Sequence, residues 1–133
     1  MLENLKELVA IDSYTNGDKI IDFLEKRLQY ISEEIIVLKN KENESKSLIV
    51  GLNTKLKDVK PIVLSGHIDT VAPDYEKYKT NPLDLTEIDG KAYGLGSIDM
   101  KSFVAVILDN LNELKKLWYP HCYCINNRWR NRT

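Results

Sequence analysis

Three side chains that can bind metal ions lie at the ends of two predicted core elements. His67 and Asp69 follow the apolar start of PIVLSGHID, and Asp99 precedes a helical pattern in GLGSIDMK. A neutral imidazole is a good ligand for zinc or cobalt, and a neighbouring carboxylate can fix its ring through the second nitrogen. A further carboxylate can bridge two metal ions about 3.5–4 Å apart in a hydrolase. The residue types therefore suit a hydrolytic metal site, with Asp69 orienting His67 and Asp99 bridging.

Each of these features also has an ordinary structural interpretation. A His-x-Asp pair alone is typical of hydrogen-bonded surface residues, and Asp99 alone suits the N-cap of the following helix. The pair Gly94–Gly96 allows close backbone approach, but Asp99 stands where a dinucleotide fingerprint has its third glycine. Cys122 and Cys124 beside His121 are further metal ligands by type, although their spacing is not that of a zinc knuckle.

The apolar pattern predicts the elements that must position these side chains. We expect helices, short strands and one hairpin at Asp89-Gly90, with the second helix capped by Thr15 or Asn16. The strand centred on 62–64 has the continuous apolar pattern of a strand buried on both faces. The alternation of helices and strands favours an α/β domain with a largely parallel sheet. The predicted helices span 2–10, 16–31 and 101–117, and the predicted strands include 34–38, 47–52 and 62–64.

The composition limits the classes of protein to which this chain can belong. Its 133 residues fit one domain, 43% of them are hydrophobic, and the net charge of −1 implies no bulk attraction to nucleic acid or to a membrane surface. No apolar run approaches the roughly 18 residues of a membrane span. The first residues, MLENLKELVAIDS, do not resemble a signal peptide, and the two cysteines make no disulfide framework. We therefore expect a cytoplasmic protein.

The segment 118–133 differs from the preceding segment 1–117. It holds both tryptophans, both cysteines and three of the four arginines, and no acidic residue follows Glu113. One interpretation is a disordered basic tail. A sharper one is a frameshift, because back-translation from His121 in the next frame allows Ile-Val-Ile-Ala-Ser-Thr-Thr-Asp-Gly-Gly-Thr-Glu, a buried strand followed by an acidic turn. We therefore divide the chain into a partial domain, 1–117, and an aberrant tail, 118–133, which a frameshift would explain.

The two motifs together resemble the M20 metallopeptidase family. SGHIDTV, then NPL, then DGKAYGLGSIDMK before a helix are similar to the N-terminal half of its catalytic domain, and the resemblance covers roughly residues 1–117. The family includes acetylornithine deacetylase, succinyl-diaminopimelate desuccinylase and carboxypeptidase G2, and the segment NPLDLTEIDGKAYGLGSIDMK most resembles the first of these. The resemblance implies part of a three-layer Zn-exopeptidase-like α/β domain with a mixed, mostly parallel sheet.

The resemblance also implies roles for the three residues. His67 would ligate one ion of a two-zinc site, with Co²⁺ as an alternative metal, while Asp69 would orient His67 and Asp99 would bridge the ions. A metal-bound water would attack the amide bond of a small N-acylated amino acid, with a later glutamate as general base. The position expected for that glutamate, in an acidic pair after the next strand, carries Asn126-Asn127-Arg128. Two smaller departures are Leu95, where arginine is common, and Ser102, where glycine is common.

These observations leave several functional hypotheses open. The first is a truncated, inactive M20 deacylase that binds metal weakly and lacks the family's dimerisation domain. It is of acetylornithine deacetylase type or, alternatively, of desuccinylase or dipeptidase type. A non-catalytic interaction module with an Arg-rich tail is the second, and completion of the site by another polypeptide is a third. All three hypotheses predict an unpaired sheet edge and an uncovered apolar face, and with them poor solubility or a molten state.

Overall fold

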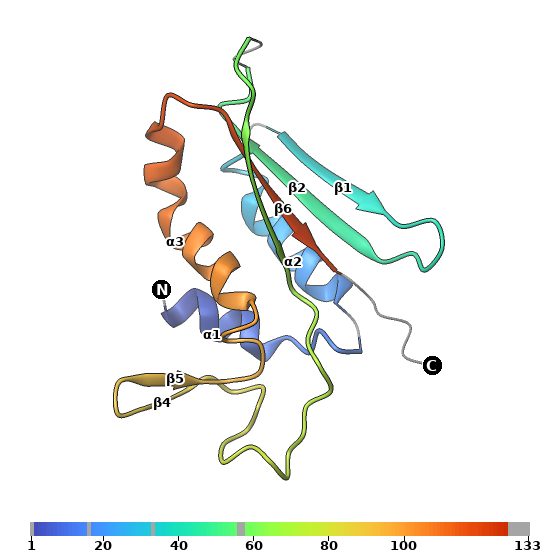
Figure 1. Cartoon of the computed structure of the whole chain (residues 1–133), viewed down its shortest axis with the longest axis vertical. Coiled ribbons are helices and arrows are strands. Elements are labelled where there is room, and N and C mark those ends of the chain that lie inside the picture. Colours follow the sequence, from blue (N-terminus) through green and yellow to red (C-terminus); the bar gives the residue numbers. More distant parts are fainter. Residues whose placement is uncertain (1, 16, 33, 56–57, 128–133) are drawn as a thin grey trace.

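Helices cover one face of a four-stranded sheet in the computed structural model, which describes residues 2–15, 17–32, 34–55 and 58–127 (Figure 1). Helix α2 packs against β1 and β2, α3 packs against β3, and α1 packs against α3. The β4–β5 hairpin lies apart from the sheet, at the end of the molecule that holds α1. The elements are α1 (Leu2–Ala10), α2 (Asp18–Leu28), β1 (Glu34–Lys39), β2 (Lys46–Leu52), β3 (Ile62–His67), β4 (Thr86–Ile88), β5 (Lys91–Tyr93), α3 (Lys101–Lys116) and β6 (His121–Asn126).

The sheet is mixed, with the strand order β1-β2-β6-β3. β2 pairs antiparallel with β1 and with β6, whereas β3 pairs parallel with β6. The predicted α/β class and mixed sheet are confirmed. Among the described strands the parallel share is smaller than expected, because the hairpin β1–β2 and the return of β6 both reverse the chain direction. Helices and sheet form two layers here, and no helix of the described residues covers the second face.

The core lies between the sheet and the helices. Side chains of β6 alternate between buried and half-buried positions, with Tyr123 and Ile125 each 1% exposed. The same face of β2 contributes three buried apolar residues, of which Leu48 lies opposite Ile125 in the register. Apolar stripes on the three helices complete this core, as their helical spacing predicted. One face of the sheet is therefore buried and the other is open.

The predicted helices and hairpin are confirmed, with differences at their ends. α2 begins at Asp18, and its N-cap is Gly17, so the prediction of a cap at Thr15 is wrong. The Thr15 hydroxyl instead donates to the Asp12 carboxylate at 2.8 Å, within a turn of its own. The other predicted cap, Asn16, lies outside the described residues. The β4–β5 turn has φ of +50° at Asp89 and +71° at Gly90, the left-handed conformations that this dipeptide favours.

The prediction that β3 is buried on both faces is wrong. Ile62, Val63 and Leu64 are 55%, 60% and 44% exposed. In the described part of the chain β3 is one of the two edge strands, with β6 as its one neighbour, and its outer face lacks a covering layer. Three consecutive apolar residues do not distinguish such an edge from a central strand. The predicted open edge and uncovered apolar face are thus present among the described residues.

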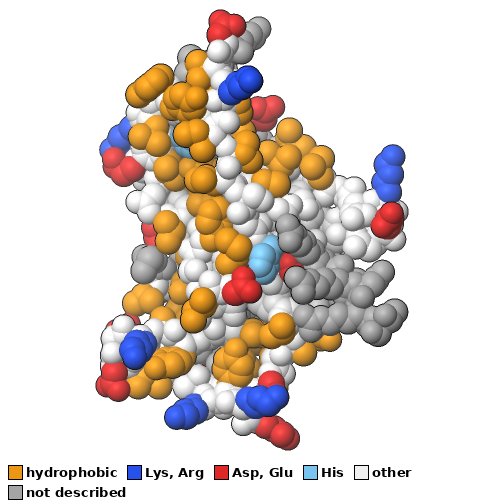
Figure 2. Space-filling model, in the orientation of Figure 1, with side chains coloured by type: hydrophobic (Ala, Val, Ile, Leu, Met, Phe, Trp, Pro, Cys, Tyr) orange, Lys and Arg blue, Asp and Glu red, His pale blue; other side chains and the backbone are white. Residues whose placement is uncertain are grey.

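The edge strand β3 exposes three consecutive apolar residues, an arrangement that favours association between copies. Figure 2 shows hydrophobic side chains gathered on the open side of the sheet. We expect the protein to self-associate, and Val63→Lys to reduce this association, because a lysine on an edge strand opposes edge-to-edge pairing. Val106→Lys, on the exposed side of α3 (Val106 is 44% exposed), serves as the matched control. Sedimentation velocity across a concentration series measures the effect, and a monomeric parent protein would contradict the prediction.

Residues 118–127, the described part of the compositionally distinct segment, belong to the same folded domain as the residues before them. β6 stands between β2 and β3, so this segment supplies a central strand of the sheet. The Arg-rich residues 128–133, on which the hypothesis of a binding tail depends, lie outside the described residues. In the described part of the chain no helix combines the length and hydropathy needed to cross a membrane.

Candidate metal site

His67 is the last residue of β3, one of the two edge strands of the sheet. The ring nitrogen Nδ1 lies 3.2 Å from the backbone carbonyl oxygen of Asp69 and 3.4 Å from its carboxylate Oδ1. Ile68 between them is fully buried, which anchors the exit from the strand. Asp69 thus approaches His67 as the sequence predicted, through its backbone carbonyl as well as its carboxylate. A carbonyl that accepts the Nδ1 proton leaves Nε2 as the ligating nitrogen.

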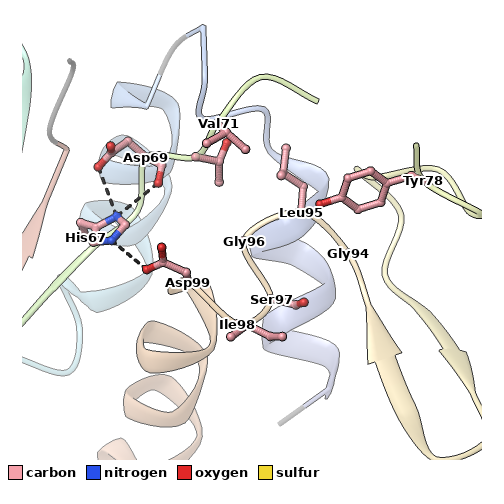
Figure 3. A pocket seen from close by; sticks show the side chains of 11 residues that line it. His67, Asp69, Val71, Tyr78, Gly94, Leu95, Gly96, Ser97, Ile98 and Asp99 are labelled. Atoms are coloured by element: carbon pink, nitrogen blue, oxygen red, sulfur yellow. Dashed lines mark hydrogen bonds and ion pairs between the residues drawn. The ribbon is translucent and has the colours of Figure 1, made fainter. Parts of the chain in front are cut away.

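Asp99 meets the other side of the same ring. Its Oδ1 lies 3.0 Å from His67 Nε2, although 32 residues separate the two in the chain (Figure 3). The alternative interpretation of Asp99 as a helix cap is wrong, because the N-cap of α3 is Met100 and no side chain caps this end. The carboxylate therefore points toward the imidazole rather than toward the helix backbone.

The contacts of the His67 ring fit a cation between Nε2 and the Asp99 carboxylate. Asp69 and Asp99 both present acceptor oxygens, and a neutral ring carries a proton on one nitrogen. With that proton donated from Nδ1 to Asp69, the Nε2 lone pair faces the carboxylate, and a metal ion between them would satisfy both. Among the described residues no group of three or more His, Cys, Asp or Glu side chains is arranged to hold a metal. The described residues thus bring together two candidate ligands, His67 and Asp99.

Two glycines set the path of the chain that delivers Asp99. Gly96 has φ of +79°, a left-handed conformation that other residues rarely adopt. A Cβ at Gly94 would lie 2.9 Å from a methyl group of Val9 in α1, so this backbone packs directly on the helix. The chain at Gly94 is therefore supported by α1, while close approach of this backbone to a metal stays a prediction.

A hollow of about 310 Å³ opens between the end of β3 and this glycine turn. Figure 3 shows Tyr78 on the side opposite His67, with the turn between them. Asp69 and Asp99 are the charged groups among the described lining residues, so the wall of the hollow is acidic. The lining comprises His67, residues 69–71, Tyr78 and residues 94–99.

One buried residue near the site was not predicted from the sequence. Lys101 is fully buried, and its Nζ donates a hydrogen bond to the Ile11 carbonyl oxygen at 2.9 Å. Burial lowers the pKa of Lys101 to about 8, against the opposing attraction of the Asp12 carboxylate. The spacing in the sequence could have indicated this burial. Lys101 precedes Val104 and Leu108 by three and seven residues, so it lies on the apolar stripe of α3.

The half-buried Asp12 lies near the buried Lys101. Burial by itself would raise the pKa of this carboxyl, but hydrogen bonds from the Thr15 hydroxyl and from the backbone N–H groups of Tyr14 and Thr15 hold the pKa below its usual value. The carboxylate is thus kept charged near the Lys101 ammonium.

The alternative metal site at the end of the chain does not form. Cys122 and Cys124 lie on the open face of β6, while His121 lies on the buried face, as their alternating burial indicates. The His121 Nδ1 donates instead to the Tyr119 carbonyl oxygen at 2.8 Å. These three side chains therefore do not converge.

Comparisons with known proteins identify relatives of this sequence. Residues 63–125 match the model of peptidase family M20/M25/M40. An acetylornithine deacetylase of Buchnera aphidicola subsp. Acyrthosiphon pisum is 32% identical over 126 residues, which are 90% of this chain and 33% of that protein. An acetylornithine deacetylase of Shigella sonnei is 51% identical over 53 residues, 40% of this chain and 14% of that protein. The chain thus spans about a third of the length of the Buchnera relative.

Solved structures share the fold. Human carnosine dipeptidase 1 superposes with a TM-score of 0.83 at 20% identity, over 99% of this chain and 32% of its own. An M20 family metallo-carboxypeptidase from Sulfolobus solfataricus gives 0.76 at 18% identity, over 95% and 30%. These structures show the fold, while the family model and the Buchnera relative confirm the resemblance to the M20 metallopeptidase family that the His-x-Asp and glycine-rich motifs predicted.

Proposed function

We propose that this chain carries the first part of the metal site of a zinc-dependent amide hydrolase that acts on small N-acylated amino acids. The convergence of His67 Nε2 and Asp99 Oδ1 at 3.0 Å is the observation that carries this proposal. The Buchnera and Shigella relatives are acetylornithine deacetylases, which favours an N-acetylated basic amino acid as the substrate of the complete enzyme.

The three residues have separate roles in this proposal. His67 offers its Nε2 lone pair, Asp69 accepts the Nδ1 proton and holds the ring, and Asp99 offers a carboxylate that two ions can share. Zinc or cobalt held there would supply a water molecule acidic enough to attack an amide carbonyl near neutral pH. The remaining ligands of a complete two-metal site are not among the described lining residues.

By itself, we expect this polypeptide to be inactive. No glutamate lies among the described residues that line the hollow, and residues 128–133 contain no acidic residue. Loss of a general base alone typically costs about 10²–10⁴-fold in rate. A complete deacetylase with these motifs would supply that group from a later part of its chain.

Zinc titration followed by calorimetry tests the metal site. We expect weak binding of zinc to the purified chain and at least about a tenfold loss of affinity in His67→Ala, because a ligand is removed. The chain's other histidine gives the control, and His121→Leu should leave the affinity unchanged. Equal zinc affinity in His67→Ala and the parent would refute the site. Zinc-dependent hydrolysis of N-acetylornithine by the purified chain would contradict the expected inactivity.

We also propose that the segment from Trp118 onward is translated from a shifted reading frame. Buried side-chain atoms without a hydrogen-bond partner support this, because three of the five among the described residues belong to His121, Tyr123 and Asn127. The shifted frame would place isoleucine at 121 and 123, where the structure has a buried, apolar environment. The nucleotide sequence of the gene tests this proposal. If the shifted reading frame does not encode an apolar strand followed by an acidic turn, the proposal is refuted.

A further inference from the structure

Lys101, the first residue of α3, is a buried cation that is bound to a distant helix. Its side chain is 0% exposed, and its ammonium Nζ donates to the Ile11 carbonyl oxygen at 2.9 Å. Ile11 directly follows α1, so the cation lies at the C-terminal end of that helix, where unpaired carbonyl groups concentrate negative charge. The nearby Asp12 carboxylate adds to the attraction. A lysine that is fully removed from water needs such compensation, and here α1 provides it.

The aliphatic part of Lys101 supports the glycine turn. The backbone N–H of Lys101 donates to the Gly96 carbonyl oxygen at 2.8 Å, which closes the turn 96–101. A Cβ placed on Gly96 would lie 3.1 Å from Lys101 Cδ and 3.2 Å from Cγ, so the lysine stem packs directly against the turn backbone. The same residue therefore closes the turn, fills the space beneath it and attaches it to α1.

Asp99 depends on this turn for its position. Its side chain is 82% exposed, so packing against neighbouring side chains contributes little to its orientation. The segment just before the turn rests on α1 as well, because Gly94 packs against Val9. The backbone between 94 and 101 is thus held to α1 at both ends, and Asp99 lies between these two points.

We propose that Lys101 is a positioning residue for the candidate metal site: it anchors the turn 96–101 to the C-terminal end of α1 and so holds the Asp99 carboxylate opposite His67. The proposal rests on the proposed metal-binding function. It assigns a role to a residue that touches neither metal nor substrate, and it makes α1 the support of a ligand located about ninety residues later in the chain.

Lys101→Met tests the proposal, since methionine keeps an unbranched apolar stem and removes the ammonium. Zinc affinity should fall by about 10–100-fold, the usual effect of losing a group that orients a metal ligand. In the metal-free protein, the ring signals of His67 in a ¹H–¹⁵N correlation spectrum should shift, because the Asp99 carboxylate is no longer held against Nε2. Lys101→Arg should recover part of the zinc affinity, because it restores a cation that donates hydrogen bonds.

A core variant separates positioning from general stability. Ile20→Val, in the buried face of α2, lowers stability modestly without touching the turn, and it should keep the parent's zinc affinity and His67 signals. If Lys101→Met does not fold, Asp12→Asn removes the charge that attracts the ammonium, and a smaller loss in the same direction is expected. Parental zinc affinity and unchanged His67 signals in the variant that folds would overturn the proposal.

The two readouts also separate this proposal from the function on which it rests. A parent protein that binds no zinc would refute the proposed function. The His67 signals of the metal-free protein would still show whether Lys101 positions Asp99.

Discussion

Replacing Ile125 by aspartate is expected to unfold this domain. Ile125 is 1% exposed in the central strand β6 and lies opposite Leu48 of β2 in the register. A carboxylate at this position would lie on the buried face of the sheet, opposite the apolar Leu48, and an unpaired buried charge costs several kcal/mol. Small domains are stable by about 5–15 kcal/mol in total, so this loss removes much or all of the stability. Far-ultraviolet circular dichroism on heating should show no cooperative transition.

The matched control for this prediction is Ile36→Asp in β1. Ile36 is 41% exposed on the open face of the same sheet. Aspartate there stays hydrated, so we expect a change within about 1 kcal/mol and a cooperative transition like that of the parent. If Ile36→Asp unfolds the protein as Ile125→Asp does, the face that we describe as open is covered in solution, and the assignment of the core to one face is wrong.

Replacing Tyr123 by phenylalanine is expected to make the protein more stable. The Tyr123 side chain is 1% exposed and its hydroxyl has no hydrogen-bond partner within the described residues. Burial raises the pKa of Tyr123 to about 12, as expected for a phenol in apolar surroundings. Removing a buried, unpaired polar group recovers its desolvation cost, about 1–3 kcal/mol. Urea denaturation should show a higher midpoint with an unchanged slope.

His121 lies two residues before Tyr123 on the same face of β6, and its replacement should also raise the stability. His121 is 5% exposed, and its Nε2 also lacks a partner in the described part of the chain. His121→Leu should therefore add to the gain from Tyr123→Phe, reduced by the lost bond to the Tyr119 carbonyl. Tyr30→Phe is the control, because Tyr30 is 86% exposed and its hydroxyl is hydrated. A loss of stability in Tyr123→Phe would show that the hydroxyl is hydrogen-bonded in solution.

Local patterns predicted most of the elements because short-range physics determines them. The apolar stripes of α1 and α3 and the left-handed dipeptide Asp89-Gly90 specify their conformations within a few residues. The two segments that carry the candidate site, which contain Asp69 and Asp99, could also be identified from the sequence. Their two motifs are specific when they occur together. The pairing of the strands in the sheet was not needed for these local elements or for the site motifs.

Long-range pairing decided the features that were not predicted. The exposure of Val63 depends on which strand flanks β3, and its own sequence does not contain that information. The position of Lys101 was missed because lysine is usually exposed, and its hydrogen-bond partner Ile11 is 90 residues away. The composition after Trp118 does not indicate that β6 lies in the middle of the sheet, because that position depends on pairing with the distant strands β2 and β3.

The place of β6 has a consequence for synthesis of the protein. During translation β2 and β3 have no shared neighbour until His121–Asn126 emerges from the ribosome, because β6 is the strand that joins them. The nascent chain up to that point can form the β1–β2 hairpin and the helices, but β3 with its metal-ligand candidate stays unattached to the sheet. A change of reading frame at Trp118 would therefore alter β6, the strand that must form before β2 and β3 can be joined in one sheet.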